Sequence, residues 1–188
     1  GSDVCSSDLC GKGSDSTMRL LAPPIVVDGR AYVMDVESQI SAVDVSNGEI
    51  VWEFDLKVPD DDDEAFGGGL AYADGRLFAS TGFADVIAID IATGKELWRK
   101  RLSGPMRAAP TVDDRRVFVI TVDNQIFALN AETGERLWSH AGIAEVAGLL
   151  GAASPAVGGG AVIVPYSSGA IFALKVEDGR LLWSDNLS

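Results

Sequence analysis

Residues 88–98 read AIDIATGKELW and form one of four copies of an eleven-residue pattern, Ala-x-Asp-x-x-x-Gly-x-x-x-Trp. The other copies begin at residues 42, 128 and 173, with Asn130 and Lys175 at the acidic position of the last two. All four tryptophans of the chain belong to this pattern. We interpret the shared positions as a structural docking motif, which comprises Ala42, Asp44, Gly48 and Trp52; Ala88, Asp90, Gly94 and Trp98; Ala128, Asn130, Gly134 and Trp138; and Ala173, Lys175, Gly179 and Trp183.

Each copy predicts a strand, a tight turn and a second strand. A mostly apolar run, such as residues 86–89, leads into the alanine, and a glycine lies six residues after it. Glycine adopts positive φ at little steric cost, so Asn47-Gly48 and Asp178-Gly179 favour hairpin turns. The alanine is small in every copy, which leaves room for a large indole. Because the aspartate recurs at one place, we expect it to accept hydrogen bonds from the turn that follows.

Upstream positions extend the unit to four strands. Ten residues before each alanine lies Tyr32, Phe78, Phe118 or Ile163, inside a short apolar run. The tryptophans recur at intervals of about 40 to 46 residues, and this period with four strands per repeat is typical of a β-propeller blade. The sequence therefore predicts an all-β fold, a partial β-propeller of four four-stranded antiparallel blades. The blades are expected at about residues 20–56, 67–102, 106–140 and 152–188.

Charge, hydropathy and the cysteine positions argue against several classes of function and structure. The 188 residues include 15 basic and 28 acidic ones, a formal net charge of −13, which argues against nucleic-acid binding because that needs a basic face. No run of 18 apolar residues exists to span a membrane. The only cysteines, Cys5 and Cys10, precede the repeats and cannot staple them. We expect residues 1–18 to be a non-native or flexible tail and residues 19–188 to form the repeats.

Two loops carry open interpretations. The acidic run Asp60–Glu64 could bind calcium, but it lacks alternating ligand spacing and a turn glycine, so a solvated loop is favoured. Leu149 and Leu150 end an apolar loop before the fourth blade, where they either form a partner patch or cover the blade edge. Three glycines, residues 67–69, open the second blade and predict a close backbone approach or a bulge near the propeller centre.

Most catalytic constellations are missing from the sequence, and only a pair of carboxylates stays open as an alternative. His140 is the only histidine, and no cysteine lies in the repeats, so neither a zinc set nor a Cys–His pair can form. No Gly-x-Ser-x-Gly nucleophile motif is present. We therefore predict a protein that is not an enzyme, with no catalytic, cofactor-binding or metal-binding residues.

The eleven-residue pattern resembles the tryptophan-docking motif of the quinoprotein-type propellers, whose tryptophans pack between adjacent blades. Several stretches further resemble the alphaproteobacterial form of the BamB family of outer-membrane protein assembly factors, a PQQ-like repeat family. These stretches are residues 19–24, 68–77, 107–111, 147–151 and 164–169.

The BamB resemblance implies a non-enzymatic lipoprotein scaffold without a cofactor, in the periplasm and associated with the outer membrane of a Gram-negative bacterium. It implies binding to the POTRA domains of BamA within the assembly complex, and a membrane link only through a lipid anchor that these four repeats lack. The family ring has eight blades, so the chain is expected to be a fragment, half of one, and to self-associate when expressed alone.

The resemblance also suggests where the partner binds. The expected partner-binding residues are Met106 and Arg107, in the loop before the third blade, with Leu149 and Leu150 before the fourth. The latter loop lacks the acidic contacts of the better-known family members, so that half of the interface is not carried over. Two alternatives stay open: a piece of a quinoprotein dehydrogenase that uses pyrroloquinoline quinone and calcium, and a ligand-binding sensor propeller.

Overall fold

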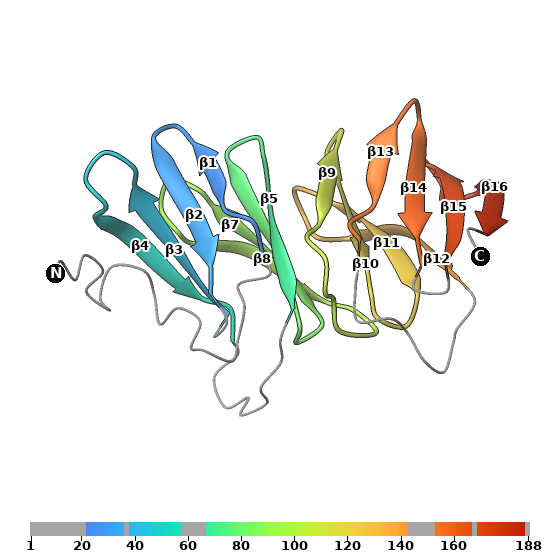
Figure 1. Cartoon of the computed structure of the whole chain (residues 1–188), viewed down its shortest axis with the longest axis horizontal. Helices are drawn as coiled ribbons and strands as arrows, with labels where there is room; N and C mark the ends of the chain where they lie inside the picture. Colours follow the sequence, from blue (N-terminus) through green and yellow to red (C-terminus); the bar gives the residue numbers. More distant parts are fainter. Residues whose placement is uncertain (1–21, 36–37, 58–66, 143–152, 167–168, 187–188) are drawn as a thin grey trace, which may run out of the picture.

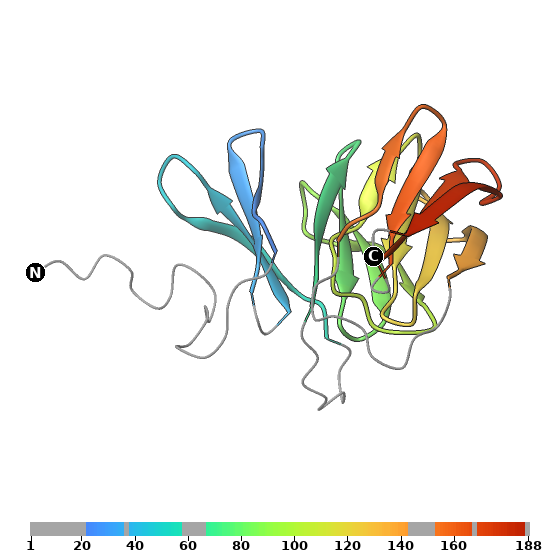
Figure 2. The same cartoon turned by 45° about the vertical axis from the view of Figure 1, so that its right-hand side comes forward.

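The computed structural model describes residues 22–35, 38–57, 67–142, 153–166 and 169–186. Within these ranges it contains four separate sheets, each of four antiparallel strands, and no helix. The prediction of a partial β-propeller is confirmed. Figure 1 shows the sheets as blades that follow one another in chain order, with the first and last blades at opposite ends of an open array, and Figure 2 shows the same blades turned by 45°. The predicted tail and the acidic run Asp60–Glu64 lie outside the described residues.

The strands of each blade pair in the order in which they occur along the chain. The first blade comprises β1 (Ile25–Val27), β2 (Arg30–Met34), β3 (Gln39–Asp44) and β4 (Ile50–Asp55); the second comprises β5 (Gly68–Ala73), β6 (Arg76–Thr81), β7 (Asp85–Asp90) and β8 (Glu96–Arg101); the third comprises β9 (Thr111–Asp113), β10 (Arg116–Ile120), β11 (Gln125–Asn130) and β12 (Arg136–Ala141); the fourth comprises β13 (Ala156–Gly158), β14 (Ala161–Pro165), β15 (Ala170–Lys175) and β16 (Leu181–Asn186).

The hydrophobic core lies between the blades. Three clusters of buried residues each combine side chains of two successive blades, such as Tyr32 with Ile87 and Phe118 with Val162. The first strands of successive blades also contact one another, β1 with β5, β5 with β9 and β9 with β13. The fold is therefore held together face to face, with the first strands of the blades gathered on one side.

A β-bulge sets the direction of each tryptophan. In every blade the third and fourth strands change register directly after the alanine, so that Ala88 pairs with Trp98 while Ile89 pairs with Glu96. The skipped residue, Leu97 in this blade, has no partner in the ladder and faces solvent. The corresponding residues Val51, Leu137 and Leu182 are exposed to a similar degree, from 43% to 47%.

Each internal tryptophan packs on the glycine turn of the next blade. A Cβ atom added to Gly94 would lie 2.6 Å from the Trp52 ring, and Trp52 Nε1 donates a hydrogen bond to the Ile91 carbonyl at 3.1 Å. Trp98 repeats this arrangement with Gly134 and the Ala131 carbonyl, and Trp138 repeats it with Gly179 and the Val176 carbonyl. The indole therefore fills a space that only glycine leaves open.

Two further parts of the pattern support this contact. The aromatic residue ten positions before the alanine meets the tryptophan of its own blade, with ring centroids 5.7 Å apart for Tyr32 and Trp52. The acidic residue holds the turn: Asp90 Oδ1 accepts hydrogen bonds from the Thr93 amide at 2.8 Å and from its hydroxyl at 2.6 Å. Asn130 accepts two turn amides in the same way, whereas Lys175 pairs with Glu177 instead.

A matched pair of glycine substitutions tests the docking contact. Gly94 and Gly75 lie in the same blade with φ of 70° and 75°, but nothing lies within 4 Å of a Cβ at Gly75. Gly75→Ala should therefore cost only the backbone strain of a left-handed alanine, about 1–2 kcal/mol. Gly94→Ala should cost about 1–3 kcal/mol more in urea denaturation, because the indole must move. Equal losses for the two variants would show that the indole does not depend on Gly94.

Candidate functional site

The segment that joins β8 to β9, residues 102–110, is here named the Arg107 loop. Its backbone is tied to the second blade by the Met106 amide, which donates to the Thr81 carbonyl at 3.0 Å. It is tied to the third blade by the Val122 amide, which donates to the Pro105 carbonyl at 2.8 Å. The loop therefore spans two blades at one end of their strands.

The inner side of the Arg107 loop is packed against the first strand of the second blade. A Cβ atom added to Gly67 would lie 2.8 Å from the Met106 carbonyl oxygen, and one added to Gly69 would lie 2.7 Å from the Ala109 side chain. The buried hydroxyl of Ser80 donates to the Ala108 carbonyl at 2.7 Å. The close approach predicted for the three glycines is confirmed, and it leaves the loop little freedom to move.

The structure separates the four residues expected to bind a partner. Arg107 is exposed, and its main chain is fixed by the contacts of the residues on either side. Met106 requires a correction: it is fully buried in the core between the second and third blades, so its side chain offers no surface to a partner. The apolar Met106 side chain packs the loop against this core. Leu149 and Leu150 lie outside the described residues.

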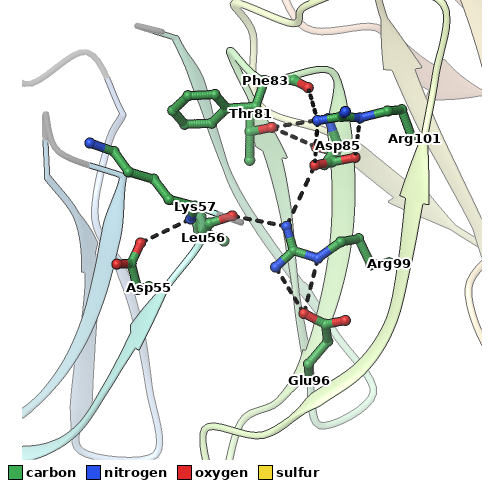
Figure 3. Close-up of polar contacts among 9 residues, drawn as sticks. All are labelled: Asp55, Leu56, Lys57, Thr81, Phe83, Asp85, Glu96, Arg99 and Arg101. Atoms are coloured by element: carbon green, nitrogen blue, oxygen red, sulfur yellow. Dashed lines mark hydrogen bonds and ion pairs between the residues drawn. The ribbon is translucent and has the colours of Figure 1, made fainter. Parts of the chain in front are cut away.

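The buried carboxylate of Asp85 contacts two arginines of β8, as Figure 3 shows. Asp85 begins β7 and is almost fully buried; it accepts a hydrogen bond from Arg101 Nε at 3.2 Å and lies 3.5 Å from Arg99 Nη1. Arg99 also donates to Glu96 and, at 2.9 Å, to the Leu56 carbonyl of the first blade. A buried charge of this kind requires partners, and here those partners link two blades.

This network was missed by the sequence analysis. Its signal is an aspartate directly before the apolar run of β7, opposite two arginines that alternate along β8. Alternating residues face the same side of a strand, so Arg99 and Arg101 can both reach Asp85. Arg101 remains largely exposed although it pairs with Asp85, and it directly precedes the Arg107 loop in the sequence.

The surface at this end of the second and third blades combines the arginines with apolar groups and with Asp123, which accepts a hydrogen bond from Ser103 of the loop at 3.3 Å. Arg101 and Arg107 are exposed, and Val122 exposes nearly half of its surface. A guanidinium group presents five N–H donors in a planar fork that fits a carboxylate. Held on a fixed backbone, the exposed Arg107 can therefore pair with a carboxylate of another molecule.

The recurring aspartates Asp44 and Asp90 accept hydrogen bonds from their own turns. Hydrogen bonds from Ser46 lower the pKa of Asp44, and those from Thr93 lower the pKa of Asp90. Both carboxyl groups are thus ionised near neutral pH and act as acceptors for their turns. Among the described residues, no group of three or more His, Cys, Asp and Glu side chains is placed to share a metal ion. The described ranges also contain no helix long and apolar enough to cross a bilayer.

His140 lies between the third and fourth blades, where its ring meets Phe172 with centroids 5.7 Å apart. Burial lowers the pKa of His140, and no described group accepts from or donates to its Nδ1. The ring of Tyr166 also meets Phe172, in an edge contact with centroids 5.1 Å apart, and burial raises the pKa of its hydroxyl. Two neutral rings packed on an aromatic side chain provide blade packing and no acid–base pair.

Comparison with known proteins identifies the family. The family model described as outer membrane protein assembly factor BamB matches residues 36–188. The chain belongs to the BamB family of PQQ-type repeat proteins.

The similar proteins include an uncharacterized protein and a quinohemoprotein enzyme. An uncharacterized protein of Rickettsia prowazekii is 31% identical over 155 residues, which cover 82% of this chain and 37% of the relative. The quinohemoprotein alcohol dehydrogenase of Comamonas testosteroni is 32% identical over 143 residues, which cover 66% of this chain and 20% of that enzyme. The Rickettsia match agrees with the alphaproteobacterial resemblance.

The solved structure of BamB from Moraxella catarrhalis superposes with a TM-score of 0.75 at 21% identity, covering 90% of this chain and 50% of the other. This likeness concerns the fold. The chain thus spans little more than a third of the Rickettsia relative and half of the Moraxella structure.

The half-buried imidazole of His140 predicts a pH dependence of stability. Because the pKa of His140 is lower in the folded chain than its usual 6.5, the unfolded state binds more protons below that pH. Stability should be fully present above about pH 6.5 and fall as the pH drops toward the folded pKa. His140→Gln should reduce this slope in urea unfolding measured from neutral to mildly acidic pH.

Ser139→Ala is the matched control, because Ser139 is exposed beside His140 and its replacement keeps the imidazole. It should retain the pH dependence of the original chain. An unchanged slope in His140→Gln would assign the dependence to other groups.

Proposed function

We propose that this chain is part of a non-enzymatic scaffold of the outer-membrane β-barrel assembly machinery, and that it binds the POTRA domains of BamA. Membership in the BamB family supports this proposal. It also supports a periplasmic location at the outer membrane, which the names of several relatives as outer membrane assembly factors favour. On this proposal the chain binds its partner without turnover and needs no cofactor.

The observation that carries the proposal is the presentation of Arg107. The Met106 amide donates to the Thr81 carbonyl at 3.0 Å and the Ala108 carbonyl accepts from the Ser80 hydroxyl at 2.7 Å, so the exposed Arg107 side chain is carried by a fixed backbone. A binding group on a rigid support loses less conformational freedom when the partner docks. An arginine at such a position is a common anchor of protein interfaces.

Electrostatics define the complementary surface. The chain as a whole carries a formal charge of −13, yet Arg107 is exposed in the loop that joins the second and third blades. A local cationic surface on an acidic protein favours a partner with carboxylates at the matching place and disfavours other approaches. We therefore assign the POTRA contact to this end, with an acidic side chain of BamA opposite Arg107.

Charge reversal tests this assignment. Arg107→Glu should weaken binding to a purified periplasmic region of alphaproteobacterial BamA at least tenfold, about 1.4 kcal/mol, in isothermal titration calorimetry. Arg136→Glu is the matched control, since Arg136 is exposed at the opposite end of the third blade and the change in charge is identical. It should bind as the original chain does. An original chain that fails to bind would contradict the proposed function, and unchanged affinity of Arg107→Glu would remove Arg107 from the interface.

A second candidate rests on the likeness to the Comamonas alcohol dehydrogenase. A quinoprotein enzyme would require carboxylates free to hold a calcium ion beside pyrroloquinoline quinone. Three of the described carboxylates do not fit this need, because Asp44 and Asp90 face their turns and Asp85 is occupied by arginines. Titration with the quinone and calcium, followed by absorbance, separates the candidates, because saturable binding would favour the enzyme.

A further inference from the structure

A cavity of about 340 Å³ lies between the second and third blades, at the end of the strands opposite the Arg107 loop. Two of the turns around it, which follow β5 and β9, lie at the top of Figure 1. The volume is near the lower limit of ligand sites in proteins, roughly 300–1,000 Å³, so the cavity suits a small molecule. The second blade contributes Asp74, Arg76 and Phe78 to its walls, and the third contributes Val112, Arg115 and Glu132.

The walls of the cavity carry two cations and two anions. Arg76 and Arg115 supply guanidinium groups, and Asp74 and Glu132 supply carboxylates. Within the ranges that the structure describes, these four side chains form no ion pair or hydrogen bond, either with one another or with other groups. Both kinds of charge are therefore available to a bound molecule.

The floor of the cavity is apolar. Phe78 and Val112 belong to the core that the second and third blades share, and Phe78 is only 1% exposed. The Phe78 ring lies against the indole of Trp98, with centroids 6.0 Å apart, and Trp98 donates a hydrogen bond to the Ala131 carbonyl of the third blade. The docking of the two blades therefore fixes this floor, while the charged groups line the walls above it.

Arg115 occupies a backbone position that the other three blades give to glycine. Its φ is 60°, and its counterparts in the turns between the first two strands are Gly29, Gly75 and Gly160. A Cβ placed on any of these glycines meets nothing within 4 Å, so space does not require glycine there. A residue with a side chain is strained at this φ, and strain of this kind marks positions where the side chain has a function.

We propose that the cavity binds a free α-amino acid with an apolar side chain. The α-carboxylate pairs with Arg76 and Arg115, because a guanidinium presents planar N–H donors that fit a carboxylate. The α-ammonium pairs with Asp74 and Glu132, and the apolar side chain rests on Phe78. This ligand accounts for the two signs of charge in one cavity, for its apolar floor and for the strained backbone of Arg115.

The amino-acid site is separate from the proposed contact with BamA. Gly67, directly before β5, packs against the Arg107 loop, whereas Asp74 follows the last residue of β5. The two surfaces thus lie one strand length apart, at opposite ends of the second blade. Loss of binding at one of them does not require loss of binding at the other.

Isothermal titration calorimetry of the full chain with L-phenylalanine tests the proposal. The amino acid should give a saturable heat with one site per chain. N-acetyl-L-phenylalanine lacks the ammonium and L-phenylalanine amide lacks the carboxylate, so each should bind more weakly by roughly tenfold or more. Equal binding of either derivative would overturn the proposal, because one charge would then be sufficient.

Two arginine variants locate the site. Arg115→Gly removes a guanidinium and restores the residue of the other blades, so it should weaken binding by roughly tenfold or more while the urea midpoint stays unchanged or rises. Arg76→Gln should weaken binding to a similar degree. Arg30→Gln is the matched control, since Arg30 holds the position of Arg76 in the first blade and lies outside the cavity. It should bind L-phenylalanine as the original chain does.

Two further results would overturn the proposal. The first is the absence of a saturable heat with L-phenylalanine in the original chain, and the second is unchanged affinity in Arg76→Gln. If Arg115→Gly lowers the urea midpoint, Arg76→Gln alone decides. Binding to BamA, measured with Arg107→Glu, can succeed or fail in each case, so the two proposals are tested separately.

Discussion

The contact of an indole with a bare turn glycine holds this structure together. Each blade is a small twisted sheet that cannot bury both of its faces, so stability depends on the neighbour that covers it. Trp52, Trp98 and Trp138 fix the separation and angle of successive blades, because the ring must fit over the glycine while its N–H reaches a carbonyl. The rest of the core then fills the layers between the blades.

The candidate binding surface is a consequence of that packing. The Arg107 loop crosses from the second blade to the third and hydrogen-bonds to the turns of both. Its position is set by the docking of the two blades, and the glycines at the start of β5 bring the second blade close enough to support it. Arg99 adds a polar link from the second blade back to Leu56 of the first. Function at this surface therefore needs several docked blades, even though a single side chain makes the proposed contact.

The sequence was sufficient for the parts of the fold that repeat. Four copies of one pattern reveal the blades, and the recurrence of Asp44 and Asp90 identifies them as acceptors for their turns. The direction of docking could not be read in this way, because the spacing of a repeat does not say which neighbour its tryptophan meets. The bulge that turns the indole toward that neighbour depends on strand register, which the sequence left open.

The candidate site was harder to predict because it does not repeat. Arg107 was found through the family resemblance, but Met106 beside it was assigned to the surface and lies in the core. A loop residue can point either way, and only the two blades that the loop joins decide which. The ion pairs of Asp85 were missed for a similar reason. Arg101 lies opposite Asp85 on the neighbouring strand. Arg99 donates to the carbonyl of Leu56, which belongs to another blade.

The most direct test of this account is the free energy of unfolding of Trp138→Ala compared with Leu137→Ala, measured by urea denaturation. The two residues are adjacent in β12, but Trp138 is covered by the fourth blade while Leu137 occupies the exposed bulge. The account predicts a loss of about 3–5 kcal/mol for the tryptophan and less than about 1 kcal/mol for the leucine. Similar losses for the two variants would contradict the claim that docked indoles hold the blades together.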